Sequence, residues 1–285
     1  MAQVEVKELL DNGVHFGHLT RKWDPNMAPF IYMERNGIHI INLYKTAAKL
    51  EEASKALAKI ASSGRKILFV ATKKQAKGIV AEKAAEVKMP YITERWPGGM
   101  LTNFDTVKKS IQKLESLNSQ LNTAMIDGLT KKETLVIKKQ ISKLEKNLSG
   151  IKNLETTPDA LFVIDTRYEK IAIQEANKLN IPVIAVVDSN NSFDGVDYMI
   201  PGNDDSMSSI ELFVKEITEI IINTKSKFVK AAPSTPIKET KNKSNSSVTK
   251  TKSIKKKQIV DTDDTSTKPD EVGVSSKATD DKKED

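Results

Sequence analysis

The sequence contains no cysteine, so neither a disulfide framework nor a thiolate metal site can form. No stretch approaches the roughly 20 consecutive apolar residues that a membrane-spanning helix requires. The first ten residues include two glutamates and a lysine and have no apolar run typical of a secretory signal peptide. These absences predict a soluble protein of the cytoplasm.

The glycine-rich loops that hold nucleotide phosphates are also absent. No G-x-G-x-x-G follows the apolar run at 66–72, and no G-x-x-x-x-G-K-[ST] or G-x-S-x-G occurs anywhere. Asp165 and Asp188 each end an apolar run, where α/β enzymes often place catalytic acids, but with no phosphate motif beside them a role in turns, where Asx side chains bond their own backbone, is favoured. An enzyme acting on a phosphorylated ligand at these aspartates is the leading alternative. Because its phosphate loop is missing, we expect no enzymatic activity.

Histidine is scarce, with only His15, His18 and His39. His15 and His18 are three residues apart, a spacing that can bring two imidazoles to one metal ion. No cysteine or convincing carboxylate nearby completes a ligand set, so a structural role is favoured for this pair. We expect no metal ligands and no cofactor, and leave open a structural ion, such as magnesium, at the strand-end aspartates.

The net charge of +7 is unevenly distributed. Residues 1–110 hold 18 Lys and Arg against 11 Asp and Glu, and 111–150 hold 7 against 4, whereas 151–224 hold 5 against 13. A basic half favours a polyanionic partner. An acidic half indicates that contact with this partner is confined to one side of the protein.

Short apolar runs alternate with longer amphipathic segments, the pattern of a mostly parallel sheet flanked by helices. The runs predicted as strands are 66–72, 91–94, 160–165, 183–188 and 198–200. The segments predicted as helices are 42–63, 75–88, 168–179 and 206 to about 225. This order predicts one α/β domain.

A different segment, residues 103–152, separates the two halves of this pattern. Apolar residues recur there at helical and heptad spacing, and Asp127-Gly128 marks a turn between two arms. Thr130 and Glu133 form a potential capping box at the start of the second arm. We therefore expect an inserted antiparallel coiled-coil hairpin that protrudes from the sheet domain.

The last part of the chain has few apolar residues. Residues 225–257 hold 11 basic residues against 1 acidic, and 258–285 hold 4 against 9. Such a composition cannot bury enough apolar surface to offset the entropy of chain ordering. We expect a disordered charged tail at 229–285, after a domain spanning 1–228.

Two basic-aromatic segments stand out, 21–26 (RKWDPN) and 95–103 (RWPGGMLTN), and they contain both tryptophans. Arginine and tryptophan offer charge and a stacking face to nucleic acid, and Gly98-Gly99 allows a partner close to the backbone. Equally, both tryptophans could cap the core while the basic residues form ordinary surface. Lys73 and Lys74, at a predicted helix start, suit phosphate oxygens, although a solvated helix start is the alternative.

The same segments resemble the bacterial family of small-subunit ribosomal protein two. The resemblance covers roughly residues 1–228. Its most specific stretches are 9–18 (LLDNGVHFGH), 21–27 (RKWDPNM), 94–104 (ERWPGGMLTNF) and 158–165 (PDALFVID), with Glu169, Ile173, Glu175 and Ile181-Pro182 at the expected offsets. The long charged tail departs from the family pattern.

The resemblance implies a three-layer, flavodoxin-like (Rossmann-like) α/β domain with a protruding coiled-coil hairpin. It also implies a structural, non-enzymatic role in the cytoplasmic small (30S) ribosomal subunit, bound to 16S ribosomal RNA between head and body. Neighbouring ribosomal proteins would be partners, among them the messenger-capturing ribosomal protein one. No membrane or small-molecule substrate is expected.

Residues and resemblance together lead us to expect RNA contacts on two parts of the protein. In the sheet domain these are Arg21, Lys22, Trp23, Asn26, Lys73, Lys74, Arg95, Trp96, Gly98, Gly99 and Asn103. In the hairpin they are Lys108, Lys109, Lys131, Lys132, Lys138 and Lys139. A further alternative is an interaction module whose hairpin pairs with another protein's coiled coil, but the basic loops would then have no purpose.

Overall fold

The structure, a computed structural model, describes residues 4–127 and 130–231, with side chains described outside 122–127 and 227–231. The predicted tail at 229–285 lies outside the described residues, except that the last helix continues to Ala231. Among the described residues, no helix is both long and apolar enough to cross a membrane.

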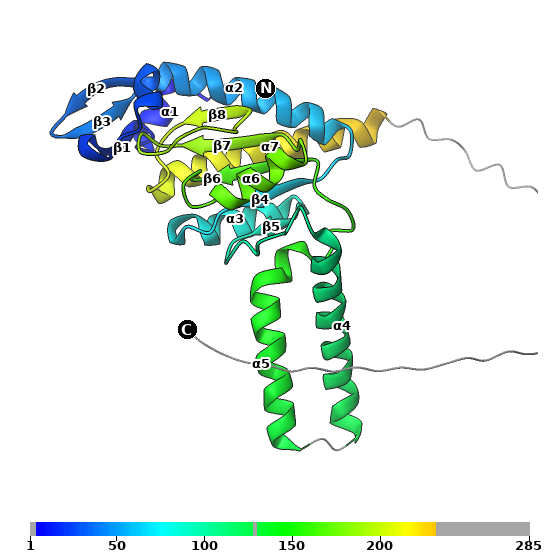
Figure 1. The fold of residues 1–285 in the computed structure, drawn as a ribbon. Helices are drawn as coiled ribbons and strands as arrows, with labels where there is room; N and C mark the ends of the chain where they lie inside the picture. The colour runs from blue at the N-terminus through cyan, green and yellow to red at the C-terminus, as the bar shows by residue number, and fades with distance from the viewer. Residues whose placement is uncertain (1–3, 128–129, 232–285) are drawn as a thin grey trace, which may run out of the picture. The chain divides into compact units, whose positions relative to one another are not determined.

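A five-stranded parallel sheet forms the centre of the protein (Figure 1). Its strand order, β5-β4-β6-β7-β8, is the 2-1-3-4-5 order of flavodoxin-like folds when the strands are numbered within this sheet. The strands are β4 (Ile67–Val70), β5 (Tyr91–Ile92), β6 (Ala160–Ile164), β7 (Val183–Val187) and β8 (Tyr198–Pro201). All five lie within or next to the predicted runs, so the prediction of a mostly parallel α/β sheet is confirmed.

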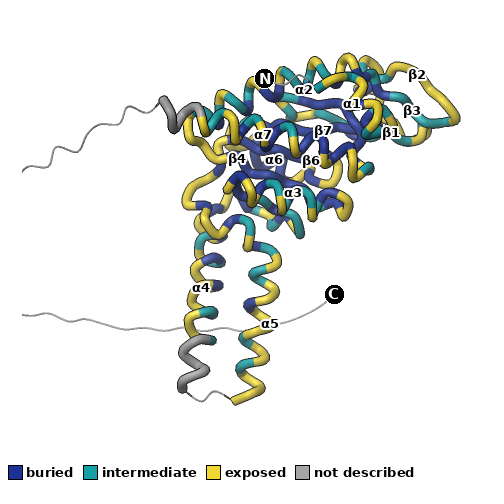
Figure 2. The backbone as a smooth tube through the Cα atoms, turned by 180° about the vertical axis from the view of Figure 1, so that it is seen from behind, coloured by how far each residue is buried: buried dark blue, intermediate teal, exposed yellow. Residues whose placement is uncertain are grey.

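Helices cover both faces of this sheet, which gives three layers. On one face α2 (Leu43–Ser62), α3 (Lys74–Glu86) and α7 (Met207–Ala231) pack over Phe69 and Phe162. On the other, α6 (Lys170–Lys178) and the start of α4 (Phe104–Asp127) pack over alternate strand residues such as Leu68 and Leu161. The strands are buried on both sides (Figure 2), as expected for a parallel sheet whose strands are continuous apolar runs.

The helix ends follow local sequence signals. The Asn42 side chain accepts hydrogen bonds from the backbone N–H groups of Tyr44 and Lys45 and so caps the start of α2. Gly64 follows the end of α2 with a φ of +70°, a conformation that glycine adopts without steric cost.

A second, antiparallel sheet near the N-terminus was not predicted from the sequence. It has the order β1-β3-β2 and is preceded by α1 (Val6–Asp11). The strands are β1 (Phe16–Leu19), β2 (Ile31–Arg35) and β3 (Ile38–Ile41), with the 3-10 helices η1 (Thr20–Lys22) and η2 (Pro25–Phe30) between the first two. The strands are short and lack clear apolar alternation. The missed signal is Asn36-Gly37, whose φ values of 54° and 74° suit the tight turn between β2 and β3.

Two long helices, α4 (Phe104–Asp127) and α5 (Lys131–Leu148), lie side by side, and the short η3 (Ser149–Ile151) follows them (Figure 1). Leu114 and Leu117 of α4 pack with Ile141 of α5. The predicted capping box is present: Thr130 accepts from the backbone of Glu133, and the Glu133 carboxylate accepts from the backbone of Thr130. The predicted turn lies partly outside the described residues.

Candidate functional site

The first basic-aromatic segment lies on the surface, in η1 and η2. Arg21, Lys22 and Asn26 are exposed, and neither basic side chain forms an ion pair with a described carboxylate. The Trp23 ring is 39% exposed and packs on one side against His39, with ring centroids 5.2 Å apart. This segment therefore offers two free cations and an accessible aromatic ring.

The second segment differs from the expectation at its tryptophan. Trp96 is only 7% exposed, and its indole N–H donates to Glu175 Oε1 over 3.2 Å. Its ring belongs to the core on the α6 face of the sheet and offers no free stacking surface. Arg95, Gly98 and Asn103 remain exposed around it. For this tryptophan the core interpretation fits the geometry.

The buried carboxylate of Glu175, on α6, accepts hydrogen bonds from several residues of the second segment. Besides the indole of Trp96, it accepts from the backbone N–H groups of Gly99 (2.7 Å), Leu101 (2.9 Å) and Thr102 (3.2 Å), and from the Thr102 hydroxyl (3.3 Å). Burial opposes ionisation of Glu175, but these donors outweigh it and hold its pKa below the ordinary value. Gly99, with a φ of +82°, supplies the left-handed turn that directs the N–H groups inward. The sequence offered Glu175 only as part of the family pattern, without this role.

Lys73 also differs from the expectation. Its ammonium lies 2.6 Å from Asp204 Oδ1, 2.6 Å from Asp205 Oδ1 and 3.3 Å from Asp165 Oδ2, and the residue is 7% exposed. Burial would lower the pKa of Lys73, but the three carboxylates outweigh it and raise the pKa above its ordinary value. The amine is therefore engaged within the protein. Lys74, next along the chain, is exposed and forms no ion pair among the described residues.

These carboxylates belong to a larger polar cluster at the carboxyl ends of β4, β6, β7 and β8. His18, from β1, lies between two of its members: Nδ1 is 3.0 Å from Asp188 Oδ2, and Nε2 is 3.0 Å from Asp205 Oδ2. The hydrogen bond with Asp188 raises the pKa of His18, since it is strongest when the imidazole is charged. The cluster thus joins the N-terminal sheet to the central sheet.

The backbone of β1 comes close to the end of β7 at this point. A side chain at Gly17 would meet the Ser189 hydroxyl, whose oxygen accepts from the backbone N–H of His18 over 2.8 Å. Nearby, the backbone N–H of Asp24 donates to the Ser189 carbonyl over 2.8 Å. The segment carrying Arg21, Lys22 and Trp23 is therefore fixed to the end of the central sheet.

The cluster carries more negative charge than its cations neutralise, with four aspartates against one lysine and one imidazole. Burial, together with Asp188 and Asp165, raises the pKa of Asp204 to about 7. His18, Asp188 and Asp204 each offer one ligand atom, and these atoms lie within 4.8 Å of one another. One imidazole and two carboxylates form a donor set suited to Zn²⁺. The sequence indicated Asp165 and Asp188 at strand ends but not their union with His18, Asp204 and Asp205.

A crevice of about 920 Å³ opens above this cluster, where flavodoxin-like proteins bind their ligands. Lys74, Lys77 and Arg167 lie along it with Tyr168, which is 66% exposed. Asp165 and Asp205 line the same space, in place of the backbone N–H groups of a glycine-rich loop. The crevice therefore lacks the phosphate cradle of a nucleotide enzyme.

The lysines of the two long helices are mostly free. Lys109, Lys131, Lys132, Lys138 and Lys139 are exposed, and none forms an ion pair with a described carboxylate. Lys108 is half-buried, with its ammonium 5.5 Å from the centre of the Phe104 ring. These positions form a second group of accessible cations.

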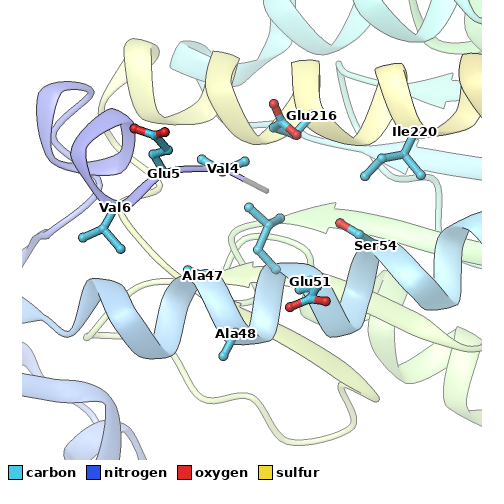
Figure 3. A pocket seen from close by; sticks show the side chains of 10 residues that line it. Val4, Glu5, Val6, Ala47, Ala48, Glu51, Ser54, Glu216 and Ile220 are labelled. Carbon is cyan, nitrogen blue, oxygen red and sulfur yellow. The ribbon is translucent and has the colours of Figure 1, made fainter. Parts of the chain in front are cut away.

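A groove between α2 and α7 has the opposite character (Figure 3). It encloses about 680 Å³, with Glu5, Glu51 and Glu216 among its lining and no basic side chain. Burial raises the pKa of Glu216, and the neighbouring carboxylates of Glu219 and Glu8 add to the effect. The groove itself is therefore unsuited to a polyanion.

Comparisons with known proteins show the family to which this chain belongs. The family model described as ribosomal protein S2 matches residues 9–224. Small ribosomal subunit protein uS2 of Flavobacterium johnsoniae is 59% identical over 242 residues, 83% of this chain and 95% of the relative. The uS2 proteins of Flavobacterium psychrophilum (62% identical; 78% of this chain, 83% of the relative) and Bacteroides thetaiotaomicron (54%; 75% and 77%) are also similar.

The chain is therefore a non-enzymatic component of the small ribosomal subunit, in the cytoplasm of bacteria. It belongs to the ribosomal protein S2 family. As a small-subunit protein it functions in translation, together with ribosomal RNA and other ribosomal proteins.

Proposed function

We propose that this protein binds small-subunit ribosomal RNA between the head and the body of the subunit through two separate surfaces. The observation that carries the proposal is the presence of exposed, unpaired basic side chains on both the sheet domain and the helical pair. Phosphate contacts from such side chains supply affinity, and RNA shape and the 2′-hydroxyls supply placement.

The first surface, here called the loop surface, lies on the sheet domain. It comprises Arg21, Lys22, Trp23, Asn26, Lys74, Arg95, Gly98, Gly99 and Asn103. The sequence predicted Lys73 and Trp96 in this surface. We assign them positioning roles instead, because Lys73 is paired with carboxylates and Trp96 is buried. Within the residues of the loop surface, Trp23 offers the accessible ring for an unstacked base.

The second surface, here called the hairpin surface, comprises Lys108, Lys109, Lys131, Lys132, Lys138 and Lys139 on α4 and α5. The heptad pattern and the contacts of Leu114 with Ile141 support a coiled-coil hairpin that braces a second RNA element. An alternative role for the hairpin, pairing with another protein's coiled coil, would leave its exposed lysines without a partner.

Removing two cations from either surface should weaken RNA binding, because the protein then neutralises fewer phosphates. In each of two double variants, Arg21→Gln/Lys22→Gln and Lys138→Gln/Lys139→Gln, we expect the slope of log affinity against log salt concentration to become less steep by about 2. Filter binding of the full chain to 16S ribosomal RNA at several salt concentrations measures this. Lys178→Gln/Lys215→Gln, two exposed lysines in the acidic stretch 151–224, is the matched control.

Equal slopes for all three double variants would contradict the placement of both surfaces. Co-migration of tagged protein with small subunits on a sucrose gradient tests the same proposal in lysate. Stable binding to a protein in RNA-free lysate through the hairpin would favour the coiled-coil alternative.

Docking of ribosomal protein one forms part of the same proposal. It rests on the family resemblance and on the acidic stretch 151–224, which we assign to a protein partner or to solvent. The groove containing Glu216 shows that this protein has acidic surface away from the cations proposed to bind RNA.

A structural divalent ion held by His18, Asp188 and Asp204 is a second component of the proposal. The surplus of carboxylates supports it, since a buried negative charge is stable only when it is neutralised. We expect Zn²⁺ at a hundredfold excess over its Kd to raise the Tm of the full chain by about 5 °C. His18→Gln should abolish the shift, and His15→Gln should retain it. A shift that persists in His18→Gln would exclude this site.

A further inference from the structure

Four basic residues gather at the edge where the parallel strands begin, opposite the polar cluster. Arg65 and Lys66 follow Gly64 at the end of α2, Lys88 follows α3, and Lys225 lies near the end of α7. α7 packs against both α2 and α3 on the same face of the sheet, which brings these ends together (Figure 1). We call this group the basic patch. It contains none of the residues proposed above to bind RNA.

The basic patch has no carboxylate partner among the described residues. Arg65, Lys66 and Lys88 are exposed and form no ion pair there. The carboxylate of Asp159 accepts from the backbone N–H of Lys66 over 3.0 Å. Burial lowers the pKa of Lys225, and the charges of Lys66 and Lys88 lower it further. Within the described residues, like charges are therefore concentrated at this edge, and the Asp159 carboxylate compensates only part of them.

Helix capping accounts for only part of this arrangement. Lys225 Nζ donates to the Val87 carbonyl at the end of α3 over 3.0 Å, a common way to satisfy a free carbonyl. Each helix C-terminus contributes roughly half a negative charge. The ends of α2 and α3 together would balance about one cation, whereas the basic patch has four.

The backbone at Lys88 provides an independent indication. Its φ is +54°, and the other described non-glycine residues with positive φ are Asn36, Asp165 and Asn180, types that tolerate this conformation. At the corresponding point after α2 the chain has Gly64, which adopts it freely. A lysine at a position that favours glycine indicates that its side chain is needed. An unfavourable local conformation of this kind is a reason to look for a function.

The chemistry of the basic patch suits phosphates better than a protein surface. Protein interfaces depend on accessible aromatic or aliphatic anchors surrounded by polar groups. Val87 and Met89, on either side of Lys88, are 5% and 4% exposed, and Ile222, three residues before Lys225 and 41% exposed, is a single aliphatic side chain, so the patch offers no cluster of such anchors. Exposed ammonium and guanidinium groups without apolar anchors are what phosphate backbones require.

We infer that Arg65, Lys66, Lys88 and Lys225 form a third RNA contact, which binds the phosphate backbone at the amino-terminal edge of the sheet. This inference rests on the proposed RNA-binding function and adds to it a surface on the far side from the loop surface's Lys74. Contacts at both edges of the sheet would fix the orientation of the domain on the RNA. Together with the hairpin surface, this would give three separate points of attachment.

The experiment compares full-length variants in their binding to 16S ribosomal RNA across salt concentrations. Arg65→Gln/Lys66→Gln should weaken binding about 10-fold at physiological salt and lower the salt slope by about 2. Lys88→Gly should lower the slope by about 1 and at the same time raise the Tm by about 2 °C, since glycine relieves both the positive φ and the like charges. Lys178→Gln/Lys215→Gln, with two charges removed elsewhere, should leave affinity nearly unchanged.

The outcomes separate this inference from the function on which it rests. Wild-type slopes in both patch variants, with reduced slopes in Arg21→Gln/Lys22→Gln, would overturn the basic patch alone. Failure of the wild-type chain to bind 16S ribosomal RNA would overturn both. A lower Tm in Lys88→Gly would refute the claim that the positive φ at Lys88 is unfavourable for lysine. Patch-dependent binding of poly-L-glutamate with an unchanged RNA slope would assign the patch to an acidic protein instead.

Discussion

Glu175→Gln should lower the free energy of unfolding by about 3–5 kcal/mol. The carboxylate accepts five hydrogen bonds, from Trp96, Gly99, Leu101 and both the backbone and hydroxyl of Thr102. An amide can accept on its oxygen only, and its NH₂ group would face N–H donors. Each buried donor left without an acceptor costs about 1–3 kcal/mol. Urea unfolding of the full chain, followed by tryptophan fluorescence, measures the loss.

Glu155→Gln is the control for this change. Glu155 is exposed, lies in the same half of the chain and accepts no hydrogen bond among the described residues. Its variant should unfold within about 0.5 kcal/mol of the wild type. A similarly small effect of Glu175→Gln would mean that the segment 95–103 holds its conformation without this carboxylate. Glu175 would then not be needed to hold Arg95 and Asn103 in the positions from which we propose that they contact RNA.

Lys73→Met should destabilise the protein by about 3–5 kcal/mol, the usual cost of removing one partner from a buried ionic network. The ammonium neutralises Asp165, Asp204 and Asp205, and the side chains of the first two are 5% and 0% exposed. Without it, carboxylates remain buried beside one another. Lys74→Met, at the adjacent exposed position, should change stability by less than about 0.5 kcal/mol.

For RNA binding we expect the opposite: the substitution at Lys74 should have the larger effect on affinity, and the one at Lys73 the smaller. Lys73→Arg keeps the charge within the network and should preserve the affinity for 16S ribosomal RNA. Lys74→Met should lower the salt slope by about 1 because it removes one phosphate contact. A normal slope in Lys74→Met would remove Lys74 from the loop surface.

These two predictions concern the positions where sequence and structure differ most. At Trp96 the sequence left stacking and core packing equally open, and the decision depends on Glu175, 79 residues later. At Lys73 a helix start with two lysines predicts a phosphate contact. The carboxylates that engage the amine lie 92 and 131 residues away at Asp165 and Asp204. No local pattern reports such distant partners.

The local signals predicted the elements of the central domain well. The apolar run at 66–72 contains β4, Asn42 caps α2, and Thr130 with Glu133 forms the capping box of α5. The N-terminal sheet was missed, since its strands mix polar and apolar residues and lack the continuous apolar runs of the central strands. Asn36-Gly37 was the one local signal that could have revealed it.

By itself, the sequence determined the secondary structure of the parallel sheet and its helices, the family, and the positions of the basic residues along the chain. Each of these depends on residue type or on short-range periodicity, which can be read without knowing what lies nearby in space. Only the tertiary structure decided which cations are free. It paired Lys73 with three aspartates, placed His18 beside Asp188, Asp204 and Asp205, and gathered Arg65, Lys66, Lys88 and Lys225 at one edge. The physical reason is that the electrostatic state of a side chain depends on neighbours that the fold brings from distant parts of the chain.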